Sequence, residues 1–589
     1  MEISHDLFQH QRSYKHSLNV KIDLYAYATE LYNSLEAINI IKRIKEIPQL
    51  GIIKVTPKKI AKTRYDYIML ELYINQIIRE HLEKDLEWAY NSPISMGNLE
   101  DGEDRPTIGD ILQLLIISYN IGHFYDTFTS SRAVTMMSSK NDLFYKLIVN
   151  ASESEQYRKV AKKILDEEDY QNLHLLNSIL ILDHFDEQQK PIKSITLKML
   201  YKYINKSTLT GDNPTDKKLK YAFKIFQDVR SVSYMAYDLQ IANTPLIIDL
   251  CNEEAIILFL RELLSKYNNN QSAHFLIQSI TKLLDDSVYN ENSNAICYYE
   301  ISQKMVSLMG KKYQNFTEIK YYDDLFSDRN SILNRTYKLK HDYIETNILK
   351  LTFSEDQRII AEDLRTNLEK INNTRIGYYD RHAGEQTVLV SIKRKCEPIK
   401  ELYAAFKVLQ HTIGYLRKIA NISPSDVRFL LCVKFFLFYL FGKRPIEINP
   451  TLDSERCVIC TRGKKSRIKK VESLLSSTKA PESKKHEAEF LLKRLESDSK
   501  NDTSIVIPAS ILIYQDDEKE QDLCEFDGII IYPMRKTNQV VFLEAKDQSK
   551  SGRGRKCLKQ KLDKLGIQCN DENIRKENQD VYLEYTVSK

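Results

Sequence analysis

The chain has 589 residues, 42% of them hydrophobic and 28% charged, and a formal net charge of +5. This length predicts about three or four domains, and the composition is that of a globular protein rather than a mainly disordered one. Only 16 Gly and 14 Pro interrupt the chain, and this scarcity favours long helices. It contains neither a GxxxxGK[ST] phosphate loop nor a Gly-x-Ser-x-Gly nucleophile elbow, so we expect no ATP-driven motor and no serine hydrolase.

Residues 1–445 are predicted to be mainly helical. Apolar residues recur at helical spacing over residues 65–82, 108–121, 256–264 and 359–371. A further helix is predicted from Ser423 to Phe441, with a capped start and a stop at Gly442. Its apolar run contains Lys434 and is too short to span a bilayer. Because the N-terminus also lacks a secretory signal, we expect a cytoplasmic protein with no membrane partner.

A faint motif lies near the N-terminus. His16-Ser-Leu-Asn-Val and Ile117-Ser-Tyr-Asn-Ile-Gly-His123 resemble the first histidine and the His-Asp-Ile-Gly-His region of HD-domain phosphohydrolases. Tyr119 and Asn120 replace the His-Asp pair of that family, so the metal would lose two ligands. We therefore expect a coincidence of helical sequence or an inactive site, and an N-terminal phosphohydrolase is the second alternative function.

Two basic clusters occur in the last third of the chain. The first lies in residues 446–485, where serine and proline residues predict a connector. Its basic residues are Lys464, Lys465, Arg467, Lys469 and Lys470. The second cluster includes Arg553, Arg555 and Lys556. Such runs are often only solvated, but two of them on either side of an active site would bind a polyanion.

The last hundred residues alternate between helical and strand patterns. Helices are predicted over 486–495 and 553–565, and strands over 504–514, 525–532, 540–546 and 581–587. The order is helix, three strands, helix, strand. The polar residues between the second and third strands have the composition of a hairpin loop, which predicts that these two strands are neighbours.

Acidic residues on these neighbouring strands are the strongest chemical signal. Glu525 and Asp527 share one face of their strand because side chains alternate, and Glu544 and Lys546 share a face of the next. Clustered carboxylates repel unless a cation neutralises them. Oxygen ligands without a nearby His or Cys favour Mg²⁺, with Mn²⁺ as a substitute. Lys546 is placed to orient a water or to stabilise a phosphate. The alternative without catalytic function is a charged sheet edge, which protects an exposed strand against aggregation.

Asp527, sixteen intervening residues and then Glu544-Ala-Lys546 resemble the motif of the PD-(D/E)xK nuclease superfamily, although the proline of that motif is absent. The resemblance implies a restriction-endonuclease-like α/β domain with a mixed sheet over residues 486–589. It further implies metal binding by Asp527, Glu544 and the carbonyl of Ala545, and catalysis by Lys546. Glu487, on the apolar face of the helix over 486–495, would be a third metal-binding acid.

The predicted architecture is an α-helical region over residues 1–445, a basic connector over 446–485 and a nuclease domain over 486–589. The predicted activity is Mg²⁺-dependent endonuclease cleavage of nucleic acid, with DNA favoured. The helical region would sense a signal, bind a protein partner or form a homo-oligomer, and this layout suggests a bacterial anti-phage defence effector. The alternative is a non-catalytic nucleic-acid-binding or scaffold protein with a relic nuclease domain.

Overall fold

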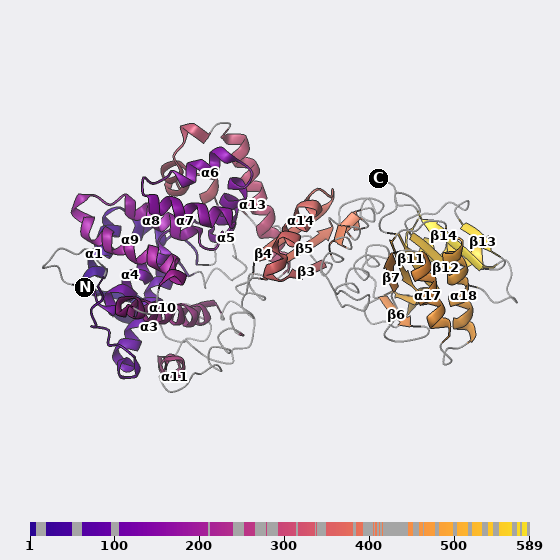
Figure 1. Cartoon of the computed structure of the whole chain (residues 1–589), viewed down its shortest axis with the longest axis horizontal. Coiled ribbons are helices and arrows are strands. Elements are labelled where there is room, and N and C mark those ends of the chain that lie inside the picture. Colours follow the sequence, from indigo (N-terminus) through magenta and orange to yellow (C-terminus); the bar gives the residue numbers. More distant parts are fainter. Residues whose placement is uncertain are drawn as a thin grey trace. The chain divides into compact units, whose positions relative to one another are not determined.

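The structure is a computed structural model that divides into two compact units, residues 1–340 and 341–589 (Figure 1). It describes residues 1–7, 19–49, 62–95, 105–209, 213–238, 253–264, 279, 292–313, 316–335, 337, 349–380, 385–392, 404–405, 407–408, 411–412, 415, 446–450, 459–462, 464–476, 482–498, 503–515, 521–532, 540–545, 553–567, 574–577 and 580–585. The first unit is helical, whereas the second contains the larger sheets. The predicted division at residue 445 therefore differs from the observed one.

The first unit begins with a two-stranded antiparallel hairpin, β1 (Glu2–Asp6) and β2 (Asn19–Asp23). Its described helices are α1 (Ala26–Ala37), α2 (Ile40–Ile44), α3 (Arg64–His81), α4 (Ile108–Asn120), α5 (Thr127–Ser138), α6 (Asp142–Val149), α7 (Glu155–Asp166), α8 (Leu173–Asp183), α9 (Lys190–Ile204), α10 (Pro214–Asp238), α11 (Glu253–Leu264) and α13 (Asn292–Lys312). Helices α3, α4 and α11 confirm three of the predicted periodic stretches, with ends that differ by at most three residues.

Helix α4 is the centre of this unit. Every residue from Ile108 to Asn120 is buried, and α1, α3, α8, α9 and α10 all pack against it (Figure 1). A helix that is apolar on all sides requires such enclosure. At its end, Gly122 lies so close to α8 that an added Cβ would stand 2.0 Å from the carbonyl oxygen of His174. The two backbones can approach this closely only because the residue has no side chain.

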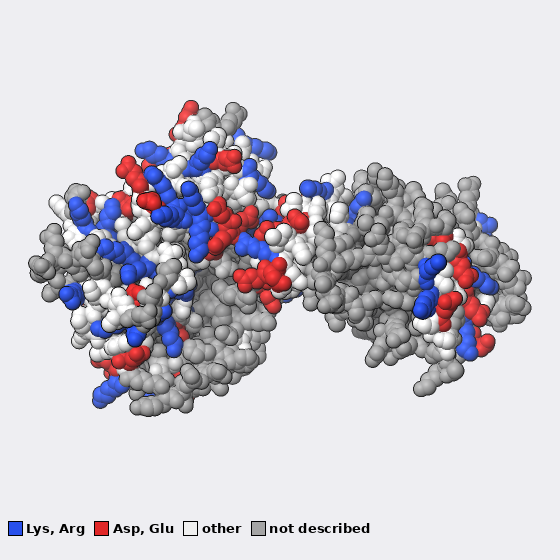
Figure 2. All heavy atoms as spheres, in the orientation of Figure 1, with Lys and Arg blue, Asp and Glu red and all other residues white. Residues whose placement is uncertain are grey.

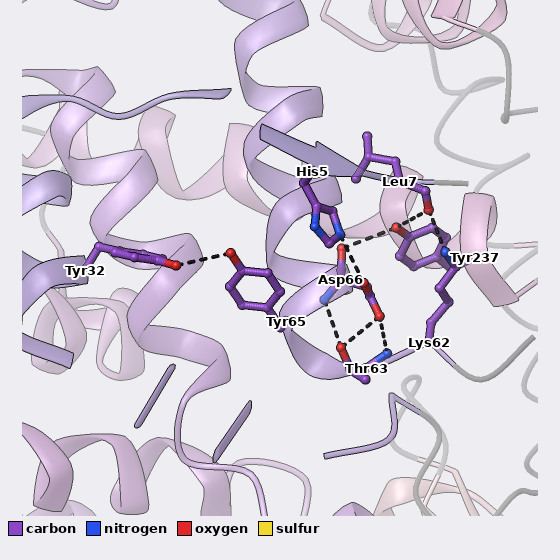
Figure 3. Close-up of polar contacts among 8 residues, drawn as sticks. All are labelled: His5, Leu7, Tyr32, Lys62, Thr63, Tyr65, Asp66 and Tyr237. Carbon is purple, nitrogen blue, oxygen red and sulfur yellow. Dashed lines mark hydrogen bonds and ion pairs between the residues drawn. The ribbon is translucent and has the colours of Figure 1, made fainter. Parts of the chain in front are cut away.

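The start of α3 ties the N-terminal hairpin to α10 (Figure 3). Thr63 and Asp66 form a reciprocal capping box, which satisfies the first amide groups of the helix. The Asp66 carboxylate also lies 3.0 Å from Nε2 of His5 on β1. From α10, the hydroxyl of Tyr237 donates to the carbonyl of Leu7 at 2.9 Å. Residues more than 200 positions apart in the chain are thereby joined at one helix end.

The second unit opens with a small three-stranded antiparallel sheet of order β3-β5-β4, packed on one helix. Its elements are β3 (Leu349–Phe353), α14 (Arg358–Glu369), β4 (Thr374–Asp380) and β5 (Gln386–Ile392). Helix α14 confirms the helix predicted over 359–371. These strands lie in a part of the chain that was predicted to be mainly helical. They were not predicted because β4 and β5 mix polar and apolar residues without the strict alternation that indicates a strand.

The C-terminal part contains a three-stranded sheet of order β10-β9-β6 and a six-stranded sheet of order β13-β14-β12-β11-β8-β7. Its elements are β6 (Ile446–Pro450), β7 (Ile459–Arg462), α17 (Lys464–Leu475), α18 (Glu482–Glu496), β8 (Thr503–Ile507), β9 (Ala509–Tyr514), β10 (Asp522–Phe526), β11 (Gly528–Ile531), β12 (Val540–Glu544), α19 (Arg553–Lys564), β13 (Ile574–Glu577) and β14 (Asp580–Tyr585). The predicted helices over 486–495 and 553–565 correspond to α18 and α19. The predicted strands over 504–514 and 525–532 are each divided between the two sheets, as β8 and β9 and as β10 and β11, and β13 was not predicted.

Helices α17 and α18 cover one face of the six-stranded sheet. Their Val471, Phe490 and Leu491 share a core with Val541 and Leu543 of β12. Glu544 follows Leu543, and side chains on a strand alternate between faces, so Glu544 points to the other face. Helix α19 contacts Glu544 there through Lys561.

Residues 446–485, which were predicted to be a connector, contain two strands and a helix. β6 pairs with β9 and β7 pairs with β8, and Val471 of α17 is fully buried in the core. The serine- and lysine-rich composition suggested a linker because charged residues on the exposed face of a packed helix resemble one. This segment is instead part of the folded unit.

Every described strand pairing in the six-stranded sheet is antiparallel, whereas the resemblance implied a mixed sheet. The reason is the β13–β14 hairpin after α19, which reverses the chain before β14 pairs with β12. A mostly helical chain with antiparallel sheets in its C-terminal part is therefore what the structure supports.

The helix predicted over residues 423–441 lies outside the described residues. Each helix in the described part of the chain is too short or too polar to cross a bilayer.

The close approach of α4 and α8 gives a testable prediction. Gly122→Ala should lower the free energy of unfolding by about 1–3 kcal/mol, because the added methyl group must displace backbone atoms. Gly310→Ala is the matched control: a Cβ on this helical glycine would meet no atom within 4 Å, and alanine should stabilise α13 by about 0.5–1 kcal/mol. Urea unfolding followed by Trp88, the chain's only tryptophan, measures both. Equal stability of the two variants would contradict the prediction.

Candidate functional site

Asp527 lies at a corner between β10 and β11, not inside one continuous strand as predicted. The register pairs Phe526 with Ile511 and Ile529 with Ile507, so Pro508 to Ser510 stand opposite only Asp527 and Gly528. An extra residue of this kind is a β-bulge, which bends the strand and re-aims nearby side chains. Pro508 cannot donate to the ladder, and it therefore favours the interruption.

The corner aims the Asp527 side chain at the end of β12. The amide of Asp527 donates to the carbonyl of Leu543 at 3.2 Å. In return, the amide of Ala545 donates to Oδ2 of Asp527 at 2.7 Å. The carboxylate thus takes the place of a backbone carbonyl and holds the residue that follows Glu544.

Glu544 ends β12 and is completely buried. Its Oε2 accepts a hydrogen bond of 2.5 Å from Nζ of Lys561 on α19. The Lys561 side chain is 16% exposed, and its ammonium lies 5.9 Å from the centre of the Phe526 ring. Lys561 belongs to the second predicted basic cluster, but its contact with Glu544 was not predicted. Its position three residues after Leu558 and next to Leu562, both buried, was the available signal that it lies at the edge of the buried face.

The pairing of β11 and β12 brings the two predicted carboxylates to the same place along the sheet. The β11–β12 ladder ends at the pair of Gly528 with Leu543, and Asp527 and Glu544 each lie one residue beyond this last pair. Lys546 lies outside the described residues, so its predicted role stays a prediction.

Glu487 lies on α18, one turn before Leu491, whose Cδ1 would be 3.1 Å from a Cβ on Gly528. The predicted helix is therefore packed next to the corner. Within the described residues, however, no three His, Cys, Asp or Glu side chains are grouped so that they could hold a metal ion. Glu487 thus does not complete a three-acid set with Asp527 and Glu544 in this conformation.

The donor atoms at the corner suit a hard cation. Mg²⁺ prefers carboxylate oxygens, and it is commonly held by one or two carboxylates while water and substrate phosphate complete its shell. Asp527 and Glu544 supply two carboxylates, which matches both the type and the number of protein ligands that Mg²⁺ commonly has. The hydrogen bonds from Ala545 and Lys561 do not prevent coordination, because each carboxylate has two oxygens with about four acceptor positions in all.

The two predicted basic clusters lie on different faces of the six-stranded sheet, since α17 and α19 do. On α17, Lys465 and Lys469 are exposed, and so is the acidic Glu472; nothing is described of the side chains of Lys464, Arg467 and Lys470. Figure 2 shows basic side chains next to acidic ones over α17 and α18. On α19, Arg555 and Lys556 are exposed, while the side chain of Arg553 is not described. The consecutive cations on α19 are the better candidate for binding phosphates.

The motif that resembles HD-domain enzymes leads to a buried polar centre in the helical unit. Asn120 donates to Oε2 of the fully buried Glu71 at 2.8 Å. Nε of Arg230 on α10 lies 3.7 Å from the other oxygen of Glu71, and its Nη1 donates to the hydroxyl of Tyr119 at 2.9 Å. Arg230 therefore places a positive charge beside the buried Glu71 and the Tyr119-Asn120 dipeptide. His16 lies outside the described residues.

His123, the last residue of this motif, stacks on His174 of α8 with ring centres 4.3 Å apart. Nδ1 of His174 donates to the carbonyl of Gln171. Burial, together with the charges of Arg230 and Arg64, lowers the pKa of His174 to about 3. Burial and the charge of Arg64 also hold the pKa of His123 well below its usual range. Both rings are therefore neutral in the folded unit at neutral pH.

The neutral His174 makes stability depend on pH. Below pH ~6.5 the unfolded chain binds a proton at this residue that the folded chain does not bind, so the free energy of unfolding falls as the pH is lowered. We expect His174 to contribute about 1.4 kcal/mol per pH unit between about pH 6 and 4. His174→Gln should reduce the slope by that amount, as measured by urea unfolding followed by Trp88 fluorescence. An unchanged slope would show that His174 is already protonated in the folded state.

No family model, no curated protein and no solved structure matches this chain. The candidate chemistry therefore rests on the corner formed by Asp527 and Glu544 and on the cations around it.

Proposed function

We propose that the C-terminal part of the second unit is a Mg²⁺-dependent nuclease that hydrolyses phosphodiester bonds. The observation that carries this proposal is the pairing of β11 with β12, which ends at Gly528 and Leu543, the residues next to Asp527 and Glu544. Two carboxylates next to the last β11–β12 pair, of which Lys561 neutralises one, repel each other and favour a bound divalent cation. Metal-assisted hydrolysis is the reaction that such a pair supports.

Each residue at the corner has a distinct role in this proposal. A bound Mg²⁺ would activate water and stabilise the charge that develops on the phosphate. Asp527 is held at the end of β12 by the amide of Ala545, so its carboxylate is positioned before any ligand arrives. Lys546 follows Ala545 and would orient the attacking water, as the PD-(D/E)xK resemblance implies.

The substrate class follows from charge. Exposed Arg555 and Lys556 on α19, the helix whose Lys561 contacts Glu544, would bind backbone phosphates near the carboxylates. These contacts suit any nucleic acid, and DNA is favoured by the family resemblance. In the same proposal the helical unit senses a signal or binds a protein partner or a second copy, and the enzyme serves as a defence effector.

The competing function is nucleic-acid binding by a relic nuclease domain. The buried ion pair between Glu544 and Lys561 favours it, because the pair already neutralises one carboxylate. The other competitor, a phosphohydrolase in the helical unit, is less well supported. Glu71 is engaged by both Arg230 and Asn120, and Tyr119 stands where the metal-binding histidine would be.

A charge-only substitution tests the nuclease proposal. Asp527→Asn keeps a hydrogen-bond acceptor for the amide of Ala545 but removes the negative charge. We expect it to lower Mg²⁺-dependent cleavage of plasmid and single-stranded DNA by at least about 100-fold without unfolding the protein. Asp522→Asn, on an exposed position of β10, is the matched control. Cleavage by Asp527→Asn at the wild-type rate would exclude this site as the catalytic centre.

Binding measurements at several salt concentrations test α19. If Arg555 and Lys556 each contact a phosphate of duplex DNA, the double substitution to alanine should reduce the slope of log K against log salt by about 1.8. The corresponding Lys465→Ala and Lys469→Ala variant on α17 should change the slope less, because an exposed acid lies close by. Fluorescence anisotropy with a labelled duplex measures both slopes. A larger change for α17 would reverse our assignment of the binding helix.

A further inference from the structure

Glu544 is neutralised by a cation that belongs to the chain itself. Its side chain has no exposed surface, and the ammonium of Lys561 lies 2.5 Å from Oε2. Burying an ionised carboxylate is costly unless a cation and hydrogen bonds accompany it. Lys561 provides both from α19, a different element from the strand that carries Glu544.

The Lys561 ammonium is held at this position by the packing of its helix. Leu558 and Leu562, on either side of Lys561, are fully buried. The ring of Phe526 also lies near the ammonium, with its centre 5.9 Å from Nζ. Phe526 packs in turn on Phe542 of β12. The lysine is thus positioned by buried neighbours, unlike a lysine on a solvated surface, which moves freely among many rotamers.

We propose that Lys561 is an internal counter-ion that occupies Glu544 in the metal-free protein, so that a divalent cation must compete with it. This inference rests on the proposed function, because it assumes that Glu544 is a metal ligand. A carboxylate shared between an ammonium and a metal ion brings two like charges close together, and their repulsion weakens metal binding. Metal affinity is therefore set by Lys561 as well as by the ligands.

The position also explains how the buried corner remains stable without metal. When no divalent ion is bound, Lys561 prevents an uncompensated charge in the core, and breaking such a buried pair is strongly destabilising. When metal binds, the ammonium no longer needs to neutralise Glu544 and becomes available to a phosphate. Removing the lysine should thus destabilise the metal-free protein and favour the metal-bound one.

Titration of the full-length protein with Mn²⁺ at about pH 8, where carboxyl groups are ionised in water, tests the competition. We expect Lys561→Met to bind Mn²⁺ at least about 10-fold more tightly than wild type and to show a larger rise of melting temperature on adding Mn²⁺. Lys561→Arg keeps the charge and should behave as wild type. Lys564→Met is the matched control, because this exposed lysine of the same helix bonds only the carbonyl of Leu523 among the described groups.

Two additional variants make the result decisive. Lys561→Gln retains a hydrogen-bond donor without the charge, and it should bind Mn²⁺ more tightly than wild type even if Lys561→Met folds poorly. Adding Glu544→Gln to Lys561→Met should abolish the gain, which locates the ion at Glu544. Unchanged or weaker affinity in both neutral variants overturns the competition. If wild type still cleaves DNA in an Asp527-dependent manner, the nuclease proposal survives that result; absence of Mn²⁺ binding in every variant overturns both.

Discussion

A buried negative charge in the core of a protein requires a partner, and this requirement organises the C-terminal unit. Glu544 has no contact with solvent, yet it ends the strand that forms the middle of the six-stranded sheet. Lys561 neutralises it from α19, which fixes that helix on the face opposite α17 and α18. The same strand end is held by the Asp527 carboxylate through the amide of Ala545. Charge compensation and strand geometry are therefore satisfied by the same few residues.

The helical unit meets the same requirement in another way. Glu71 is also fully buried, and Arg230 lies beside it while Asn120 donates to it. Burial raises the pKa of Glu71 above its ordinary range, although Arg230, Asn120 and Arg64 act in the opposite direction. This centre is closed by aromatic packing, since Arg230 also stacks 4.1 Å from the centre of the Tyr119 ring. Neighbouring side chains of the helical unit thus close this centre, whereas the Asp527 corner combines two acids with Lys561 of α19.

Periodicity predicted the elements well because each depends on residues that are close in sequence. Helix α3 and helix α4 both follow a reciprocal capping box and an apolar pattern of helical period, and β11 and β12 follow short apolar runs. The bulge at Pro508 was not predictable in this way, because a shift of one residue between two strands leaves the alternation of each strand intact. It moved Asp527 from a strand position to a corner.

Contacts between distant segments also could not be predicted from the sequence. Lys561 pairs with a residue 17 positions earlier, and its place beside the buried Leu558 and Leu562 indicates only that it borders the buried face of its helix, not which acid it contacts. The basic stretch before α18 had the composition of a linker, although burial of Val471 makes it part of the core. The pairing of β11 with β12 was thus predicted from the sequence, whereas the contact between Lys561 and Glu544 was not.

Anomalous diffraction from crystals grown with Mn²⁺ would test the metal site most directly. The account predicts an anomalous peak within coordination distance of carboxylate oxygens from both Asp527 and Glu544, with the Lys561 ammonium displaced from Oε2. A crystal in which Lys561 still bonds Glu544 at saturating Mn²⁺, with no peak between the two acids, would contradict it.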